Sequence, residues 1–258
     1  MGLRDLLYRA YEARLSRQLM GAPVPAHIGV ILDGNRRWAK QVGAAAAHGH
    51  RQGAANVQDF LQWASEAGVQ VVTLWMLSTD NLHRPEAELR PLLEIICDAV
   101  EEIGDRDLWP VSIVGNMDLL PEAVVGRLTD VAERTAALSD LPEKPMTVNI
   151  AVSYGGRQEI ADAVRAHLYE RAEAGVSLAD AAASLTVEDI AAYLYTRGQP
   201  DPDLVIRTSG EQRLSGFLLW QTVYSEYYFC EVYWPDFRHV DFLRALRDYS
   251  QRERRRGK

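Results

Sequence analysis

Short, continuous apolar runs alternate along this chain with longer segments whose apolar residues recur at helical spacing. The runs are rich in β-branched or aromatic residues and are bounded by Gly, Pro, Asn or Asp, which is typical of buried strands. They cover residues 27–32, 69–77, 111–115, 146–153, 204–207 and 227–233. Strands that alternate with helices in this way pair in a mostly parallel central sheet flanked by helices on both faces. We therefore predict an α/β fold.

Helical spacing is clearest in six segments between or after these runs. They cover residues 50–67, 86–103, 121–138, 157–174, 186–196 and 239–255. In the first of them Val57, Leu61 and Ala64 lie on one face, as in a helix that packs on a sheet. We expect residues 1–24 to form an N-terminal helical extension and residues 25–258 to form a single domain with a basic tail.

The charge and the cysteines exclude several classes of protein. With 28 Lys and Arg against 36 Asp and Glu, the chain has a net charge of −8 and lacks the basic field of a non-specific nucleic-acid binder. Cys97 and Cys230 each lie in an apolar run, as buried reduced thiols do, which fits a cytoplasmic protein. No apolar run is long enough to span a bilayer, so we expect membrane contact to be peripheral at most.

The loop after the first predicted strand, DGNRRW at residues 33–38, combines a carboxylate, a glycine and two arginines at the start of a helix. Glycine lets the backbone approach an anion, a helix N-terminus supplies free N–H groups, and each arginine can make two bonds to a phosphate. Asp33 amid these donors could hold Mg²⁺ against the same phosphates. A capped helix with solvated arginines is the alternative interpretation.

Two further loops follow predicted strands at the edge of the sheet where functional residues gather. Residues 78–85 (STDNLHRP) place polar groups after a very apolar strand, although this segment alone could be an ordinary helix cap. Residues 207–217 (RTSGEQRLSGF) again combine arginines, hydroxyls and glycines, which indicates a second phosphate site. Since the chain contains neither a P-loop nor a GxGxxG motif, we predict a two-substrate enzyme whose substrates both carry phosphate or diphosphate.

Several segments, in order along the chain, match one known family: ILDGNRRWA, HGHRQGA, STDNLHR, NIAVSYGGR, DLVIRTSGEQRLSGFLLWQTVYSEYYF and the terminal RRRG. Over residues 25–257 the chain resembles the cis-prenyltransferases, also called Z-isoprenyl diphosphate synthases. The resemblance implies a homodimer with a hydrophobic product tunnel beneath the diphosphate sites. It also implies the reaction: isopentenyl diphosphate elongates an allylic diphosphate with a new Z double bond, and diphosphate is released.

The same resemblance implies roles for individual residues. Asp33 and Asn81 would be catalytic, and Asp33 and Glu226 would be the carboxylates for Mg²⁺. The residues that would bind the allylic substrate are Gly34, Asn35, Arg36, Arg37, Trp38, His50, Ser78 and Arg84. The residues that would bind isopentenyl diphosphate are Arg207, Arg213, Ser215, Arg255 and Gly257. The last two belong to a tail motif that would reach into the partner's active site, whereas the residues alone also fit a solvated helix end.

Condensation requires a base that removes a proton from isopentenyl diphosphate. Asp33, Asn81 acting through a water molecule, and the departing diphosphate are all candidates. Neither the spacing nor the resemblance chooses between them.

Strand parity places Leu74 and Met76 on one face of the second predicted strand, where they would face the tunnel. Long-chain family members carry a small residue at the position of Met76, so a bulky residue there implies an early floor to the tunnel. We therefore expect a short product, Z,E-farnesyl diphosphate made from geranyl diphosphate. The alternative is a flexible methionine that bends aside and admits a decaprenyl or undecaprenyl chain.

Two residues of this chain depart from the family pattern. Ala46 stands where many members carry an arginine, and Leu82 where long-chain members commonly carry tryptophan. The first substrate site would therefore have one cation fewer than usual.

A second hypothesis is that the chain is the non-catalytic partner subunit of a heteromeric prenyltransferase. Such a subunit would keep the fold but lose the catalytic motif. The residues whose presence favours an enzyme are Asp33, Asn35, Arg37 and Arg207.

Overall fold

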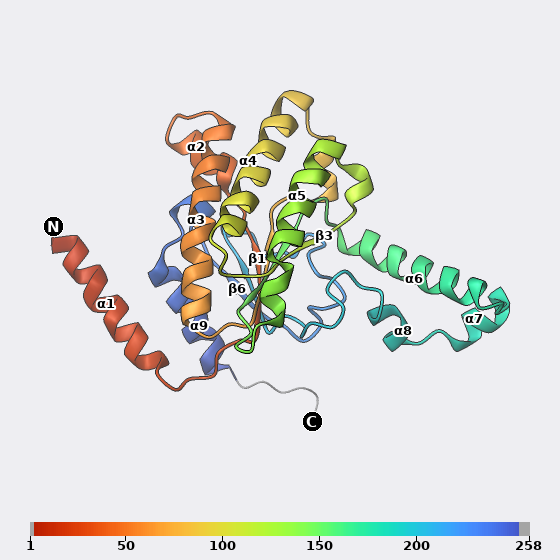
Figure 1. The fold of residues 1–258 in the computed structure, drawn as a ribbon. Helices are drawn as coiled ribbons and strands as arrows, with labels where there is room; N and C mark the ends of the chain where they lie inside the picture. The colour runs from red at the N-terminus through yellow and green to blue at the C-terminus, as the bar shows by residue number, and fades with distance from the viewer. Residues whose placement is uncertain (1–2, 253–258) are drawn as a thin grey trace.

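A sheet of six parallel strands lies at the centre of residues 3–252, the part of the chain that the computed structural model describes (Figure 1). The strands are β1 (His27–Ile31), β2 (Val71–Trp75), β3 (Val111–Val114), β4 (Thr147–Ala151), β5 (Leu204–Arg207) and β6 (Glu226–Phe229). Their order across the sheet is β3-β4-β2-β1-β5-β6. Each strand falls within its predicted run except β6, which begins one residue earlier, so the predicted α/β sheet is confirmed.

Helices precede, connect and follow these strands. The α-helices of the described residues are α1 (Leu3–Leu19), α2 (Asn35–Gln41), α3 (Ala46–Glu66), α4 (Glu86–Asp105), α5 (Glu122–Thr135), α6 (Gly156–Glu173), α7 (Leu178–Ser184), α8 (Val187–Ala191) and α9 (His239–Gln251). The short 3₁₀ segments are η1 (Thr79–His83), η2 (Met117–Leu119), η3 (Ala136–Asp140) and η4 (Trp234–Asp236).

Some helix ends differ from the prediction. Helix α3 begins at Ala46, before the predicted start, because alanines extend a helix without contributing to its apolar stripe. Helix α8 ends at Ala191, and α9 ends before Arg252, whose backbone is extended at φ −84° and ψ 132°. The seven-residue helix α7 was not predicted, because its sequence shows no helical spacing of large apolar residues. The Ser177 side chain caps its first turn.

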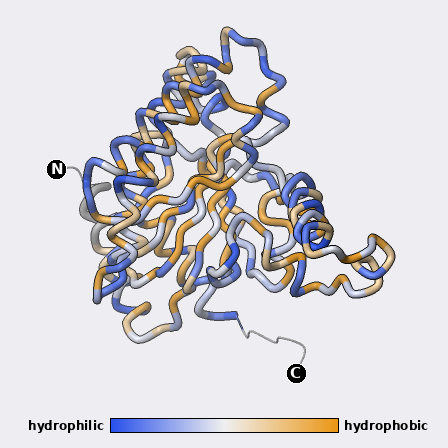
Figure 2. Tube along the Cα trace, turned by 45° about the vertical axis from the view of Figure 1, so that its right-hand side comes forward, coloured by the Kyte–Doolittle hydropathy of each residue, from blue (hydrophilic) through white to orange (hydrophobic). Residues whose placement is uncertain are grey.

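The two faces of the sheet are covered differently. Helices α3, α4, α5 and α9 pack on one face and form the main hydrophobic core with alternate strand residues such as Ile28 and Val30 of β1. On the other face Ile31 and Trp75 pack against Tyr154, Phe217 and neighbouring residues from irregular segments. The strands accordingly form the hydrophobic centre of the molecule (Figure 2).

Gly29 permits this second layer to approach β1 closely. A Cβ atom built on Gly29 would lie 2.9 Å from Cε1 of Phe217, closer than non-bonded carbons pack. The Phe217 ring also stacks on Trp75, with ring centres 5.2 Å apart. A glycine in β1 therefore positions the segment that follows β5.

Helix α1, in the predicted N-terminal extension, packs against α9. Leu15 is fully buried in a cluster with Val240 and Leu243. The guanidinium of Arg238 lies 4.7 Å from the centre of the Tyr8 ring. Within residues 3–252, no helix has the length and apolar character needed to cross a membrane.

Candidate functional site

The loops that follow β1, β2 and β5 meet at the carboxyl edge of the sheet and enclose a cleft of about 710 Å³. This is the edge where parallel sheets bind ligands. The residues predicted for the site that line this cleft are Asp33, Gly34, Asn35, Arg36, Arg37, His50, Met76, Ser78, Asn81, Arg84, Arg207, Arg213 and Ser215. The three loops are thus parts of one site.

Asp33 is fixed at the end of β1 by its backbone. Its N–H donates to Thr208 Oγ1 at 3.0 Å, and the Thr208 hydroxyl donates to the Asp33 carbonyl oxygen at 2.6 Å. Trp234 N–H donates to the same carbonyl oxygen at 3.0 Å. Because Thr208 follows β5, the neighbour of β1 in the sheet, strand pairing places this clamp.

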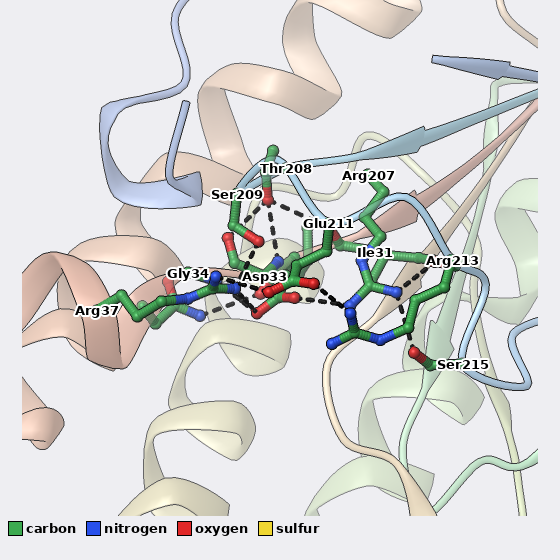
Figure 3. Close-up of polar contacts among 12 residues, drawn as sticks. Ile31, Asp33, Gly34, Arg37, Arg207, Thr208, Ser209, Glu211, Arg213 and Ser215 are labelled. Carbon is green, nitrogen blue, oxygen red and sulfur yellow. Dashed lines mark hydrogen bonds and ion pairs between the residues drawn. The ribbon is translucent and has the colours of Figure 1, made fainter. Parts of the chain in front are cut away.

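The Asp33 carboxylate lies between two arginines. Arg207 Nη2 donates to Oδ2 at 2.8 Å, and Arg37 Nη2 is 3.3 Å from Oδ1 (Figure 3). Burial would raise the pKa of Asp33, but the hydrogen bond and charge of Arg207, the charge of Arg37 and the Gly34 N–H hold it below its usual value. Asp33 is therefore an ionised carboxylate at neutral pH.

The backbone at Gly34 allows helix α2 to begin directly after Asp33. Gly34 has φ 106°, and a Cβ atom there would lie 2.7 Å from the Tyr233 ring, so a side chain is excluded on both grounds. The resulting turn brings Arg37 to the cleft. Arg37 Nη1 donates to Glu211 Oε1 at 2.8 Å and Nη2 donates to Ser209 Oγ at 2.7 Å.

The loop after β2 forms a hydrogen-bonded wall. Ser78 Oγ accepts from the Asn81 N–H at 3.2 Å, and Asn81 Oδ1 accepts from Arg84 Nη2 at 2.8 Å. Glu88 Oε1 is shared by Arg84, at 3.0 Å, and Arg36, at 3.3 Å. This carboxylate joins α4 to α2 and to Arg84, the residue after η1, and it holds two cations on the same side of the cleft.

The loop after β5 is organised around Arg207, whose side chain is only 4% exposed. Besides bonding Asp33, Arg207 Nη1 donates to Ser215 Oγ at 3.0 Å and to the backbone carbonyl of Arg213. Ser209 and Ser215 adopt positive φ values of 79° and 53°, an uncommon conformation for serine. One buried guanidinium therefore connects the two predicted phosphate sites.

His50 lies where the polar cleft meets a small apolar pocket of about 40 Å³. Burial and the charge of Arg84 lower the pKa of His50 to about 4, so its imidazole is neutral at pH 7. Its Nε2 atom is buried without a hydrogen-bond partner among residues 3–252. Nε2 is therefore available to a bound ligand.

Met76 lines both the cleft and the apolar pocket, which helices α3 and α4 close with Val57, Leu92 and Ile96. Leu74 is fully buried on the same side of the sheet and lines neither space. The difference arises because β2 ends at Trp75, so Met76 lies beyond the strand.

Several predicted residues are not part of this cluster. Trp38 packs beside His48, with ring centres 5.7 Å apart, and does not line the cleft. Glu226 begins β6 and pairs in register with Leu204 at the opposite, amino end of β5, where it binds Arg252 at 2.6 Å. One chain alone therefore does not bring Glu226 to Asp33. Arg255 and Gly257 lie outside the described residues.

The donor set in the cleft fits Mg²⁺ that binds together with a ligand. No group of three or more His, Cys, Asp or Glu side chains suited to a metal occurs in the described part of the chain. Mg²⁺, however, commonly binds one or two carboxylates and completes its shell with water and substrate phosphates. Asp33 supplies an ionised carboxylate that opens into the cleft.

Thr208, Ser209 and Glu211 lie in the predicted phosphate loop at residues 207–217, after a buried strand, but none of them was assigned a role of its own from the sequence. Glu88 was not singled out. The partners of these residues could not be found in this way. Glu211 and Arg37, for example, are 174 residues apart in the chain.

The fold and the site together define a class of protein: a parallel α/β protein with an arginine-rich cleft for polyanions at the carboxyl edge of its sheet. Residues 31–257 match the family model described as putative undecaprenyl diphosphate synthase. The chain is 56% identical over 258 residues to the (2Z,6E)-farnesyl diphosphate synthase of Thermobifida fusca, covering 99% of this chain and 98% of the relative. It is 50% identical over 260 residues to the (2Z,6E)-farnesyl diphosphate synthase of Mycobacterium tuberculosis, covering 99% and 97%.

A solved structure agrees. Lavandulyl diphosphate synthase from Lavandula x intermedia, in complex with dimethylallyl diphosphate, is 33% identical with a TM-score of 0.81, over 91% of this chain and 98% of that one. The chain belongs to the cis-prenyltransferase family. The expected family and fold are thereby confirmed.

Proposed function

We propose that this protein condenses geranyl diphosphate with isopentenyl diphosphate and releases diphosphate and Z,E-farnesyl diphosphate. The observation that carries the proposal is the position of Arg207, which joins Asp33 and Arg37 on one side to Arg213 and Ser215 on the other. Two anion-binding groups in one cleft are what a reaction between two diphosphates requires. The farnesyl diphosphate synthases at 50–56% identity support this choice of product.

The first half-site would hold the allylic diphosphate. Arg37 and the α2 N-terminus would bind its phosphate oxygens, and neutral His50 would donate a hydrogen bond to them from the edge of the apolar pocket. Asp33 would hold Mg²⁺, which when bound helps to neutralise the leaving diphosphate. As the bond to the allylic carbon breaks, the diphosphate takes the electron pair, and these preorganised cations lower the barrier by stabilising it.

The second half-site would hold isopentenyl diphosphate through Arg207, Arg213 and Ser215. The terminal alkene carbon then bonds to the allylic carbon, and the loss of a proton forms the new Z double bond. Arg84 fixes the Asn81 amide beside the cleft, which suits Asn81 to orient a water molecule that accepts this proton. Asp33 and the departing diphosphate are the other two candidate acceptors.

The size of the apolar space supports a short product. The pocket next to the cleft has a volume of about 40 Å³, and Met76 lies where the two spaces meet. A longer chain would have to displace Met76 or the α4 side chains behind it, and such overpacking typically costs about 1 to 3 kcal/mol. A single condensation adds only five carbons and so displaces fewer of these side chains than repeated condensations would.

The protein would act as a homodimer in the cytoplasm. The edge strand β6 and the residues before it expose Val223, Tyr224 and Phe229, which are 68%, 75% and 36% accessible. A second copy would cover this apolar edge and bring a Glu226 carboxylate and a C-terminal tail toward the site that one chain leaves incomplete. Cys97 and Cys230 are buried free thiols, as suits a reducing compartment.

Incorporation of label from isopentenyl diphosphate tests the proposal. The purified chain alone, with geranyl diphosphate and Mg²⁺, should convert labelled isopentenyl diphosphate into a solvent-extractable prenyl product, and EDTA should stop the reaction. If the folded chain incorporates label only after a second type of subunit is added, it is the non-catalytic partner of a heteromeric enzyme.

A further inference from the structure

Glu211 is an anion placed inside an anion-binding cleft. Its Oε1 atom accepts from Arg37 Nη1 at 2.8 Å, and its Oε2 atom accepts from Arg213 Nη1 (Figure 3). Arg37 lies in α2 after β1, and Arg213 lies in the loop after β5. A single carboxylate thus bridges an arginine of each proposed half-site.

The negative charge of Glu211 should weaken the binding of diphosphate substrates in this cleft. A carboxylate between two arginines repels any diphosphate that approaches them. The side chains of Glu211, Arg37 and Arg213 are 28%, 42% and 60% exposed, so water weakens this repulsion without abolishing it. Hydrogen bonds from Arg213 and Arg37 hold the pKa of Glu211 below its usual value, so the repelling charge persists at neutral pH.

Holding Arg37 in place does not account for Glu211, because Arg37 keeps a hydrogen bond to Ser209, at 2.7 Å, and an ion pair with Asp33. Arg207 holds the backbone carbonyl of Arg213 but not its guanidinium. The feature peculiar to Glu211 is that its carboxylate fills the point between the two guanidiniums.

We infer that Glu211 keeps the two diphosphate sites apart by occupying the place where one diphosphate would bridge Arg37 and Arg213. A phosphate group offers two oxygens that can pair with two guanidiniums much as a carboxylate does. Without Glu211, inorganic diphosphate or a misplaced isopentenyl diphosphate would span both half-sites and block the second substrate. Glu211 is thus a specificity-determining residue, and this role rests on the proposed function.

The test is the affinity for inorganic diphosphate, measured by calorimetry in EDTA so that no metal contributes. Glu211→Gln removes the charge and keeps the size of the side chain. We expect it to bind inorganic diphosphate roughly tenfold more tightly than the wild type, and inorganic diphosphate should inhibit turnover at a correspondingly lower concentration. Glu231→Gln is the matched control, because Glu231 lies beside Gly210 but does not line the cleft, and its affinity should change less than about twofold.

The outcomes separate this role from others. Unchanged or weaker binding in Glu211→Gln would overturn the inference and make Glu211 a residue that merely orients the arginines. If the wild type turns over normally in that case, the proposed function still stands. If, with Mg²⁺ restored, the wild type and both variants bind neither inorganic diphosphate nor isopentenyl diphosphate, the proposed function itself is overturned.

Discussion

Arg207 donates from Nη2 to Asp33 Oδ2 at 2.8 Å, although the two residues are 174 positions apart in the chain. The pairing of β1 with β5 creates this contact, because Ile31 and Arg207 are partners in the register and Asp33 follows two residues later. The second nitrogen of the same guanidinium reaches Ser215. The ion pair therefore links the two halves of the proposed reaction, and its removal is the first variant to make.

Asp33→Ala should abolish turnover while the fold remains. The Asp33 side chain is 30% exposed and belongs to the cleft rather than the core, so its loss removes the proposed metal ligand without opening a cavity. We expect kcat to fall at least about a hundredfold, measured in saturating Mg²⁺, with circular dichroism as the check on folding. Asp33→Asn, which keeps an acceptor for Arg207, should be equally inactive. Normal product formation by either variant would remove Asp33 from the mechanism.

Deletion of residues 255–258 should raise the KM for isopentenyl diphosphate or lower kcat sharply, because the tail would complete the partner subunit's site. Arg252, the last described residue, binds Glu226 and the Tyr227 carbonyl at the β6 edge, so the described part of the chain ends at the surface proposed for the dimer. Steady-state kinetics with each substrate varied in turn measures the effect. Full activity in the truncated protein would return the tail to a solvated helix end.

Met76→Ala should lengthen the product. The substitution shortens a side chain that lines both the cleft and the apolar pocket. Each added isoprene unit gains roughly 0.8 kcal/mol per buried CH₂ if space exists. Chromatography of the products measures chain length. Leu74→Ala is the comparison: Leu74 is fully buried and lines neither space, so its truncation should mainly cost stability, about 2 to 5 kcal/mol. Identical products from wild type and Met76→Ala would show that Met76 sets no limit.

Stability should fall as the pH drops below 6.5, in part because of His27. This imidazole is fully buried between the Pro200 carbonyl and the Thr73 hydroxyl, and burial lowers its pKa to about 4. In the unfolded chain His27 takes up a proton near pH 6.5, whereas in the folded chain it stays neutral until about pH 4. His27 should therefore lower the free energy of unfolding by about 2 kcal/mol between pH 7 and pH 5. Urea unfolding at both pH values measures the change. In His27→Gln the fall should be smaller by that amount, and an equal fall would exclude His27 as its source.

The sheet and half of the site follow from local patterns, whereas the pairing of charges does not. Short apolar runs predict parallel strands because a strand buried on both faces has no polar alternation. Asp33 and Arg207 were then expected at one edge, since both end such runs. The bridge from Arg37 through Glu211 to Arg213 depends on how three loops fold over one another, and no spacing in the chain encodes it.

Strand parity predicts which side of the sheet a residue faces but not where the strand ends, as β2 shows. It places Leu74 and Met76 on one side of the sheet, as the structure shows, but it carries no information on where β2 ends. Glu226 shows a related limit. The resemblance of its segment to the family implies that Glu226 is a carboxylate of the site. The register of β6 instead places Glu226 beside Leu204, at the amino end of the sheet, opposite to the cleft in the same chain.

The length and geometry of the product test the central claim most directly. Geranyl diphosphate, labelled isopentenyl diphosphate in excess, Mg²⁺ and the purified wild-type chain should yield one condensation product, which after removal of the diphosphate co-migrates with Z,E-farnesol and not with the all-E isomer. Predominant decaprenyl or undecaprenyl products would contradict the short-chain assignment, and an all-E product would contradict the stereochemistry that defines the proposed reaction.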